Sequence, residues 1–289
     1  MTAFNDISEN FAQELISIVS ANRGGRGVST LCRPSDWRRA ARAFSKIKSA
    51  AVVSGFYIPA AKAPETDGPG GAVMLARAFM RQGIPSEIWT DSLCVAAMKA
   101  CASAAGYPAE LVKEAPLSLP KEAPEGIVFT ERLGRAKDGG YYNFRKEDIS
   151  RWTPPLDRLA DEARLRGVVT LGIGDGGNEV GMGNFYDALC ALLPEYRQCL
   201  CTVTTDYALA VDVSNWGAYA LCAALSHVWG AWRGPEPNEE LSMLRALSAL
   251  GVVDGISRTA ELTVDGFDIC TQDNIILSLH GLWNRFASR

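Results

Sequence analysis

Apolar runs alternate with segments of helical spacing along most of the chain. Four runs rich in β-branched residues end in polar loops and predict strands, at residues 50–56, 127–131, 167–174 and 207–213. A further strand is predicted at residues 86–91, and helices are predicted at residues 70–82, 93–105 and 156–166. This alternation is typical of βαβ units with a parallel sheet. We therefore predict an α/β fold with an open, mostly parallel, Rossmann-like sheet flanked by helices.

The chain is expected to form one structural unit. Residues 1–48 predict mainly helices joined by a loop at residues 22–27, and we expect this helical segment to pack on a main α/β domain at residues 49–289. The Pro-rich stretch at residues 108–124 is the best internal linker, but it is too short to indicate a domain boundary. Open parallel sheets bind ligands outside the carboxyl ends of their strands, so function is expected in the loops there.

Composition and charge narrow the class of partner. The chain has 289 residues, 47% of them hydrophobic and 21% charged, which is ordinary for a globular protein with a large core. Its formal net charge of −4 indicates no basic surface for nucleic acid or an anionic membrane, so a small-molecule partner is expected. The N-terminus lacks the pattern of a signal or transit peptide, and no apolar run approaches the about 20 residues needed to cross a bilayer. We expect a cytoplasmic protein, and a homo-oligomer is compatible with the sequence.

Cysteine and histidine indicate neither a disulfide framework nor a metal centre. The eight cysteines form no CxxC pair and lie mostly within apolar runs, which favours buried thiols in a reducing compartment. The two histidines, His227 and His280, are far apart and lie beside or within apolar stretches, so packing is their expected role.

The loop after one predicted strand carries the densest group of glycine and polar residues. Residues 172–184 contain six glycines together with Asp175, Asn178 and Glu179. Glycine allows the backbone to approach a ligand or to adopt positive φ, and carboxylate and amide oxygens suit a hard divalent cation or a substrate ammonium group. The predicted roles are Asp175, Asn178 and Glu179 as catalytic groups, Asp175 and Glu179 as metal ligands, and Gly176 and Gly177 as substrate contacts.

Two other interpretations of this loop stay open. Gly172, Gly174 and Gly177 match a GxGxxG pattern directly after a strand, which is typical of a nucleotide-binding turn. Asp175 would place a negative charge where a pyrophosphate should lie, which weakens that interpretation. The loop could also be a tight structural turn, although so many polar side chains without apolar filler disfavour this.

A second polar segment, residues 64–71, lies between a predicted strand and a predicted helix. Glu65 and Asp67 could hold a cation or an amine, and free N–H groups at the helix start could hold a carboxylate. Thr66 or Asp67 could instead only cap the helix. We predict that Asp67 is catalytic and that Glu65, Thr66 and Gly68 contact the substrate.

Two further loops provide candidate substrate contacts, at Arg132 and at Ser214 and Asn215. Ser214 and Asn215 open a helix, where Ser214 suits an N-cap and Asn215 has no such structural explanation. Arg132 could pair with a substrate carboxylate, or it could neutralise Glu131 or a loop acid. The sequence Arg-Gly-Gly-Arg-Gly at residues 23–27 could bind an anion, although a flexible basic turn is the favoured interpretation.

Several of these motifs resemble the D-glutamate cyclase family. The resemblance runs from about residue 20 to residue 280 and rests on Glu65-Thr66-Asp67-Gly68-Pro69, residues 172–184, Ser214-Asn215-Trp216-Gly217, and the pair Val253-Asp254-Gly255 and Val264-Asp265-Gly266. Arg26-Gly27 and Tyr141-Tyr142-Asn143 also fit. Animal members join this domain to a second, N-terminal domain, so we expect this chain to be a stand-alone form of the cyclase-like domain.

The resemblance implies a lyase that converts D-glutamate to 5-oxo-D-proline and water with the help of a divalent metal such as manganese. In this reaction an unprotonated α-amine reacts with a γ-carboxylate, which is a poor electrophile and must lose an oxygen. A Lewis acid and a nearby proton donor meet that need, and the oxygen-rich loops could supply a cation site. A nucleotide- or phosphate-binding enzyme that uses the turn at residues 172–177, or a non-catalytic amino-acid-binding protein, stays the alternative.

Overall fold

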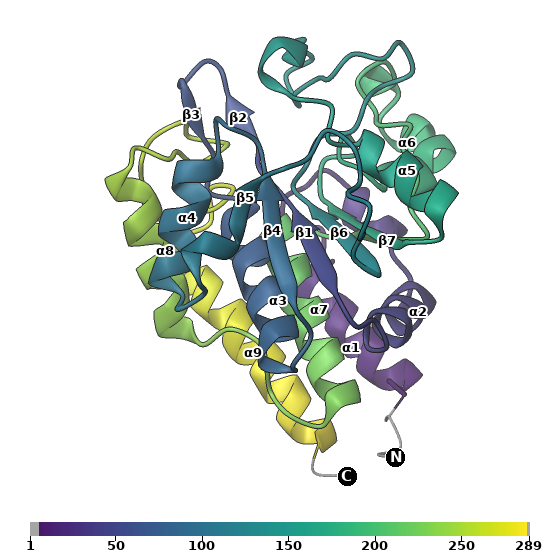
Figure 1. Cartoon of the computed structure of the whole chain (residues 1–289), viewed down its shortest axis with the longest axis vertical. Coiled ribbons are helices and arrows are strands. Elements are labelled where there is room, and N and C mark those ends of the chain that lie inside the picture. Colours follow the sequence, from purple (N-terminus) through teal and green to yellow (C-terminus); the bar gives the residue numbers. More distant parts are fainter. Residues whose placement is uncertain (1–5, 288–289) are drawn as a thin grey trace.

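A six-stranded parallel sheet forms the centre of the protein. The computed structural model describes residues 6–287, and within them the strand order is β5-β4-β1-β6-β7-β8, with every neighbouring pair parallel. The strands are β1 (Ala50–Val53), β4 (Ser86–Thr90), β5 (Val112–Glu114), β6 (Gly126–Thr130), β7 (Val169–Gly174) and β8 (Tyr207–Ala210). A separate antiparallel hairpin, β2 (Tyr57–Ile58) and β3 (Ala63–Pro64), stands at the upper end of Figure 1. The predicted α/β fold with a parallel sheet is confirmed.

Helices surround the sheet and connect its strands (Figure 1). They are α1 (Glu9–Val19), α2 (Pro34–Phe44), α3 (Pro69–Arg81), α4 (Val95–Ala104), α5 (Arg158–Arg166), α6 (Tyr186–Leu192), α7 (Ser214–Trp229), α8 (Pro237–Ala249) and α9 (Ile269–Ala287). Short 3-10 helices cover Val28–Leu31, Ala109–Leu111, Ser150–Trp152, Met182–Phe185 and Pro194–Tyr196. No helix among the described residues is long and apolar enough to cross a membrane.

The first helices pack on the rest of the fold. α1 and α2 contact each other and α7, and α1 also contacts α9. Both helices lie within the segment predicted at residues 1–48, of which residues 1–5 lie outside the described residues. The division of the chain after residue 48 stays a prediction.

The strand order changes direction between β1 and β6. The chain runs outward from β1 to β4 and β5, returns to the other side of β1 as β6, and continues outward through β7 and β8. Ligands of open α/β sheets bind in the crevice at such a reversal, outside the carboxyl ends of the strands. Because all six strands are parallel, the loops after β1, β6, β7 and β8 emerge at this one edge, and these loops carry the candidate site residues.

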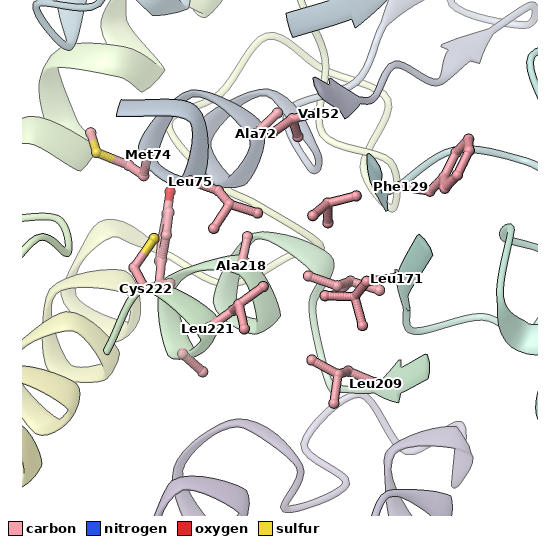
Figure 2. Packing of buried hydrophobic residues seen from close by; sticks show 14 of the residues in the cluster. Val52, Ala72, Met74, Leu75, Phe129, Leu171, Leu209, Ala218, Leu221 and Cys222 are labelled. Atoms are coloured by element: carbon pink, nitrogen blue, oxygen red, sulfur yellow. The ribbon is translucent and has the colours of Figure 1, made fainter. Parts of the chain in front are cut away.

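The main core lies between the sheet and helices α3 and α7. Figure 2 shows apolar side chains that meet there, among them Val52, Leu75, Leu171, Leu209 and Leu221. α7 is buried along almost its whole length, since its sequence is apolar on nearly all sides. α3 and α7 approach so closely that a Cβ at Gly71 would lie 2.8 Å from the Cβ of Ala218. Glycine at this position therefore brings the starts of the two helices together at the sheet edge.

The strand predicted at residues 207–213 ends earlier, at Ala210, and two other predicted segments differ from the structure, each for a physical reason. The strand predicted at residues 50–56 ends at Val53, because Gly55 turns the chain with a φ of +125°. The predicted linker at residues 108–124 contains the edge strand β5. In that strand Lys113 and Glu114 are exposed, so the sequence shows no run of apolar positions that would predict a strand.

Candidate functional site

Three carboxylates from three different strand ends meet at the carboxyl edge of the sheet. Asp67 follows β1 and its hairpin, Glu131 follows β6 directly, and Asp175 follows β7 directly. One carboxylate oxygen of each lies within 4.8 Å of the other two, and all three residues are buried. We refer to Asp67, Glu131 and Asp175 as the acidic centre. Acidic groups at this spacing could hold one metal ion. The sequence predicts Asp67 and Asp175 as site residues, whereas it suggests Glu131 only as a partner of Arg132.

Asp67 and Asn215 tie the starts of α3 and α7 to each other. The Asp67 carboxylate accepts hydrogen bonds from the backbone N–H groups of Ser214 at 2.9 Å and Asn215 at 2.7 Å, where α7 begins. The side-chain oxygen of Asn215 in turn accepts from the N–H groups of Gly68 at 2.9 Å and Gly71 at 2.7 Å, where α3 begins. Free N–H groups at a helix start favour negative charge, so the start of α7 stabilises the ionised form of Asp67.

Ser214 binds Glu131 and does not cap its helix. Ser214 is the first residue of α7 and Val213 is the N-cap, so the suggested N-cap role of Ser214 is wrong. Its hydroxyl donates a 2.6 Å hydrogen bond to Oε2 of Glu131. Glu131 itself has a φ of +43°, a strained conformation for a residue with a Cβ. This turn at the end of β6 accompanies the placement of its carboxylate beside Asp67 and Asp175.

Within the described part of the chain, Asp175 is paired through one of its two oxygens. Arg26 donates to Oδ1 of Asp175 at 2.5 Å and to Asp265 at 3.1 Å, and its guanidinium lies 5.1 Å from the centre of the Phe144 ring. Oδ2 of Asp175 is buried and has no hydrogen-bond partner among the described residues. Because a buried polar atom without a partner is costly, this oxygen is a candidate ligand atom for a cation. The sequence favours a basic turn for Arg26 and includes Asp265 only through the family resemblance.

Glu179 stabilises the glycine-rich loop, residues 172–184, through hydrogen bonds to its backbone. Its carboxylate accepts hydrogen bonds from the backbone N–H groups of Asp175 at 3.2 Å, Gly176 at 2.7 Å and Gly177 at 2.8 Å. Three amides that converge on one carboxylate are the groups that a nucleotide-binding turn would offer to a phosphate. Glu179 does not belong to the three-carboxylate group, and its catalytic and metal-binding roles stay predictions.

Other predicted residues surround this centre. Glu65 is buried, and its Oε1 has no hydrogen-bond partner among the described residues. Thr66 donates a 2.8 Å hydrogen bond to the carbonyl oxygen of Thr263 and so holds the backbone. Asn178 donates to the carbonyl oxygen of Tyr142 at 2.8 Å. Asn178 therefore connects the glycine-rich loop to the polar segment at residues 132–150, which follows β6.

Arg132 lies outside the acidic centre, although it is the next residue after Glu131. Its buried guanidinium pairs with Asp91 and donates to the carbonyl oxygens of Gly55 at 2.8 Å and Pro154 at 2.6 Å. These contacts use its charge within the fold. The predicted contact of Arg132 with a substrate carboxylate would have to displace them.

A cavity of about 210 Å³ opens onto the acidic centre. This volume is below the about 300–1,000 Å³ typical of sites for drug-sized ligands, so the cavity suits a small metabolite. The predicted residues that line it are Glu65, Asp175, Gly176, Asn178 and Glu179. The predicted residues that are not part of its lining are Thr66, Asp67, Gly68, Arg132, Gly177, Ser214 and Asn215. The lining residues that the sequence does not predict as site residues are Arg26, Phe56, Ile58, Glu131, Asn143, Phe144, Arg145, Gly255, Ile256 and Asp265.

The site carries far more negative than positive charge. Burial raises the pKa of all five carboxyls that crowd around it, Glu65, Asp67, Glu131, Asp175 and Asp265. The pKa of Asp67 reaches about 7, with burial as the main cause and the charge of Asp265 next. Arg26 lowers the pKa of Asp175 but does not cancel the effect of burial. Carboxylates buried with so little positive charge favour the binding of protons or of a cation.

Two comparisons with known proteins point to one family. The family model described as D-glutamate cyclase-like, C-terminal, matches residues 15–280. The chain is 33% identical over 301 residues to D-glutamate cyclase, mitochondrial, of Homo sapiens. That match covers 88% of this chain and 48% of the human protein, so the chain spans about half the length of this relative. The name of this relative places it in mitochondria, and a cytoplasmic location for this chain stays a prediction.

A solved structure, RecJ in complex with Mn2+ from Thermus thermophilus, aligns over 86% of this chain and 38% of its own. Its sequence identity is 13% and its TM-score is 0.34, a likeness too weak to carry over a function or a metal site. The family model and the alignment with the human relative, in contrast, each cover most of the chain. They show that the chain belongs to the D-glutamate cyclase-like family.

Proposed function

We propose that the protein is a lyase that converts D-glutamate to 5-oxo-D-proline and water with the help of a divalent cation. Membership of the D-glutamate cyclase-like family supports the type of reaction. The observation that carries the proposal is the buried group of Asp67, Glu131 and Asp175 at the edge of the sheet where ligands are expected.

These three residues fit a divalent cation. Hard cations such as Mn2+ and Mg2+ prefer carboxylate oxygens, and the three side chains offer such oxygens within 4.8 Å of one another. Oδ2 of Asp175 is buried and has no other partner among the described residues. Asp67, Glu131 and Asp175 would hold the cation, and when bound it would supply Lewis-acid polarisation of the γ-carboxylate.

The chain's own residues must also move protons. The substrate ammonium loses two protons as its nitrogen forms a bond to the γ-carboxyl carbon, and the oxygen that this carbon releases gains two protons and leaves as water. Glu65 is suited to carry them, because it lines the cavity and its Oε1 is buried without a hydrogen-bond partner among the described residues. We assign Glu65 the role of accepting the two ammonium protons one after the other and donating each to the leaving oxygen.

The glycine-rich loop disfavours a nucleotide-binding enzyme. The N–H groups of Asp175, Gly176 and Gly177 already bind the carboxylate of Glu179, so they are not free for a phosphate. The surrounding carboxylates would also repel an anionic phosphate. A non-catalytic amino-acid-binding protein would use the same cavity, and turnover distinguishes it from an enzyme.

Incubation of the purified protein with each enantiomer of glutamate tests the proposal, with 5-oxoproline measured by chiral chromatography. We expect lactam from D-glutamate in the presence of Mn2+, less from L-glutamate, and loss of product after treatment with a chelator. Glu122→Gln, which changes an exposed acid outside the cavity lining, is the matched control and should keep full activity. No lactam from either enantiomer with Mn2+, Mg2+ or Ca2+ would exclude the cyclase reaction.

A further inference from the structure

The polar segment after β6, residues 132–150, reaches the cavity through Asn143, Phe144 and Arg145. Its tip is a tight turn in which the Asn143 side-chain oxygen accepts from the N–H groups of Arg145 at 2.9 Å and Glu147 at 3.1 Å. The segment is fixed to the glycine-rich loop by the hydrogen bond from Asn178 to the carbonyl oxygen of Tyr142. This part of the cavity lining is therefore connected to the glycine-rich loop, which also carries Asp175.

Aromatic packing at the tip also holds this segment in place. The Phe144 ring stacks on Tyr196 with 4.3 Å between the ring centres, and the guanidinium of Arg26 lies 5.1 Å from the centre of the Phe144 ring. Asn143, Phe144 and Arg145 all line the cavity. The turn thus presents three consecutive residues to any ligand inside.

Among residues 6–287, two cationic side chains line the cavity, Arg26 and Arg145, and they differ in how their charge is used. Arg26 is bound by the carboxylates of Asp175 and Asp265. Arg145 forms no ion pair within the described residues, and its guanidinium donates one hydrogen bond of 3.4 Å to the carbonyl oxygen of Ile256. That distance exceeds the about 2.7–3.2 Å of an ordinary N–H···O hydrogen bond, so a carboxylate could replace the carbonyl with little loss.

We propose that Arg145 binds the α-carboxylate of the substrate and so selects α-amino dicarboxylates. This inference rests on the proposed function, because it assumes a substrate whose other carboxylate lies at the acidic centre. A substrate with two carboxylates meets a strongly negative floor formed by Glu65, Glu131 and Asp175. Its second carboxylate therefore needs a cation elsewhere in the cavity, and a guanidinium can bind it with two parallel hydrogen bonds. Arg145 provides this group in the cavity lining.

Three variants separate this role from a structural one. Arg145→Gln removes the charge, Arg145→Lys keeps the charge without the two-pronged geometry, and Lys146→Gln removes a neighbouring charge that packs on Tyr196 and does not line the cavity. We expect Arg145→Gln to raise KM for D-glutamate about 10- to 100-fold, with kcat within about threefold of wild type. The lysine variant should fall between the two, and Lys146→Gln should match wild type.

The substrate analogue 4-aminobutyrate has the same chain as glutamate without the α-carboxylate. Calorimetric titration of wild type and Arg145→Gln with D-glutamate and with 4-aminobutyrate, in the presence of Mn2+, tests the contact without relying on turnover. Weaker binding of D-glutamate to Arg145→Gln, with binding of 4-aminobutyrate unchanged, supports the proposal. Equal affinity of both proteins for D-glutamate, equal losses for the two ligands, or no binding of D-glutamate to wild type would overturn it. If wild type binds D-glutamate but forms no lactam, the proposed reaction fails while the role of Arg145 stands.

Discussion

Glu131 and Arg132 are neighbours in the sequence, yet they belong to two buried charged clusters of opposite character. Arg132 pairs with Asp91 and donates to two carbonyl oxygens, so its charge is matched by partners of the fold. Glu131 lies with Asp67 and Asp175, which share its sign, and burial raises its pKa well above the ordinary value. A matched buried pair indicates a structural role, whereas an unmatched group of like charges indicates a binding site.

Backbone conformation separates these two clusters. Successive side chains of an extended strand point to opposite sides of a sheet, and the positive φ of Glu131 adds a sharp turn where β6 ends. Ser214 then fixes the Glu131 carboxylate by a hydrogen bond of 2.6 Å. Two consecutive residues at the point where the strand order reverses thus have different roles: Arg132 stabilises the fold, and Glu131 belongs to the candidate site.

Breaking the buried ion pair between Arg132 and Asp91 should change the protein most. Arg132→Met leaves Asp91 buried without its ion-pair partner, which typically costs about 3–5 kcal/mol. We expect the free energy of unfolding, measured by urea denaturation without added metal, to fall by that amount. A decrease of less than about 1 kcal/mol would show that the Arg132–Asp91 pair does not hold this edge together.

Asp175→Asn tests whether the group of like charges formed by Asp67, Glu131 and Asp175 is needed for the reaction. The change keeps the size of the side chain and removes its charge, so we expect kcat for lactam formation to fall about 10²-fold or more. The melting temperature should change little, because Arg26 keeps its ion pair with Asp265 and the repulsion among the buried carboxylates decreases. Steady-state kinetics and a thermal melt of the same sample measure both. Normal turnover together with normal metal binding would instead make Glu179 the better candidate in this loop.

The buried carboxylates of Asp67, Glu131 and Asp175 should also make the stability of the fold depend on pH. Asp67 has a pKa of about 7 in the folded protein, raised from an ordinary value of 3.8. Between these values the folded protein binds a proton that the unfolded chain has released, so the free energy of unfolding without metal should fall as pH rises through this range. A bound cation favours the ionised carboxylate. Thermal melts should therefore show greater stabilisation by Mn2+ at about pH 8 than at about pH 5, and equal stabilisation at both would contradict this explanation.

Removing the hydrogen bond between Asn178 and the carbonyl oxygen of Tyr142 should have a smaller effect than the other changes. Asn178→Ala removes one hydrogen bond to the Tyr142 carbonyl oxygen, which typically contributes about 0.5–1.5 kcal/mol. We expect a small decrease in stability and a KM for D-glutamate raised several-fold, because the turn that carries Arg145 is held less firmly. Asn143→Ala loosens the same turn from within and should act in the same direction. Unchanged kinetics in both variants would show that the turn does not need this support.

Much of the fold could be predicted from the sequence, because buried parallel strands are continuous apolar runs and their polar loops are conspicuous. Asp67 and Asp175 were predictable for that reason, since each lies in a loop rich in glycine and acids. The strand order is not written in any local pattern, so the reversal between β1 and β6 required the structure. The edge strand β5 has too few apolar residues to give a signal.

Three residues of the site lacked a local signal of their role. Glu131 lies at the end of a buried strand beside an arginine, which suggested a simple ion pair, and its positive φ is not visible in the sequence. Arg26 and Asp265 are separated by 239 positions along the chain and meet only in the folded protein. The clue available was an acid at the end of a strand next to the predicted crevice, which would have pointed to Glu131.

Anomalous diffraction from crystals grown with Mn2+ and D-glutamate locates a metal independently of the protein atoms. If Asp67, Glu131 and Asp175 together hold the divalent cation used in the reaction, we expect one peak about 2.0–2.6 Å from an oxygen of each of the three carboxylates. A peak bound by Glu179 and remote from Glu131, or a substrate bound in the cavity with no metal peak beside it, would show that these three residues do not hold the cation.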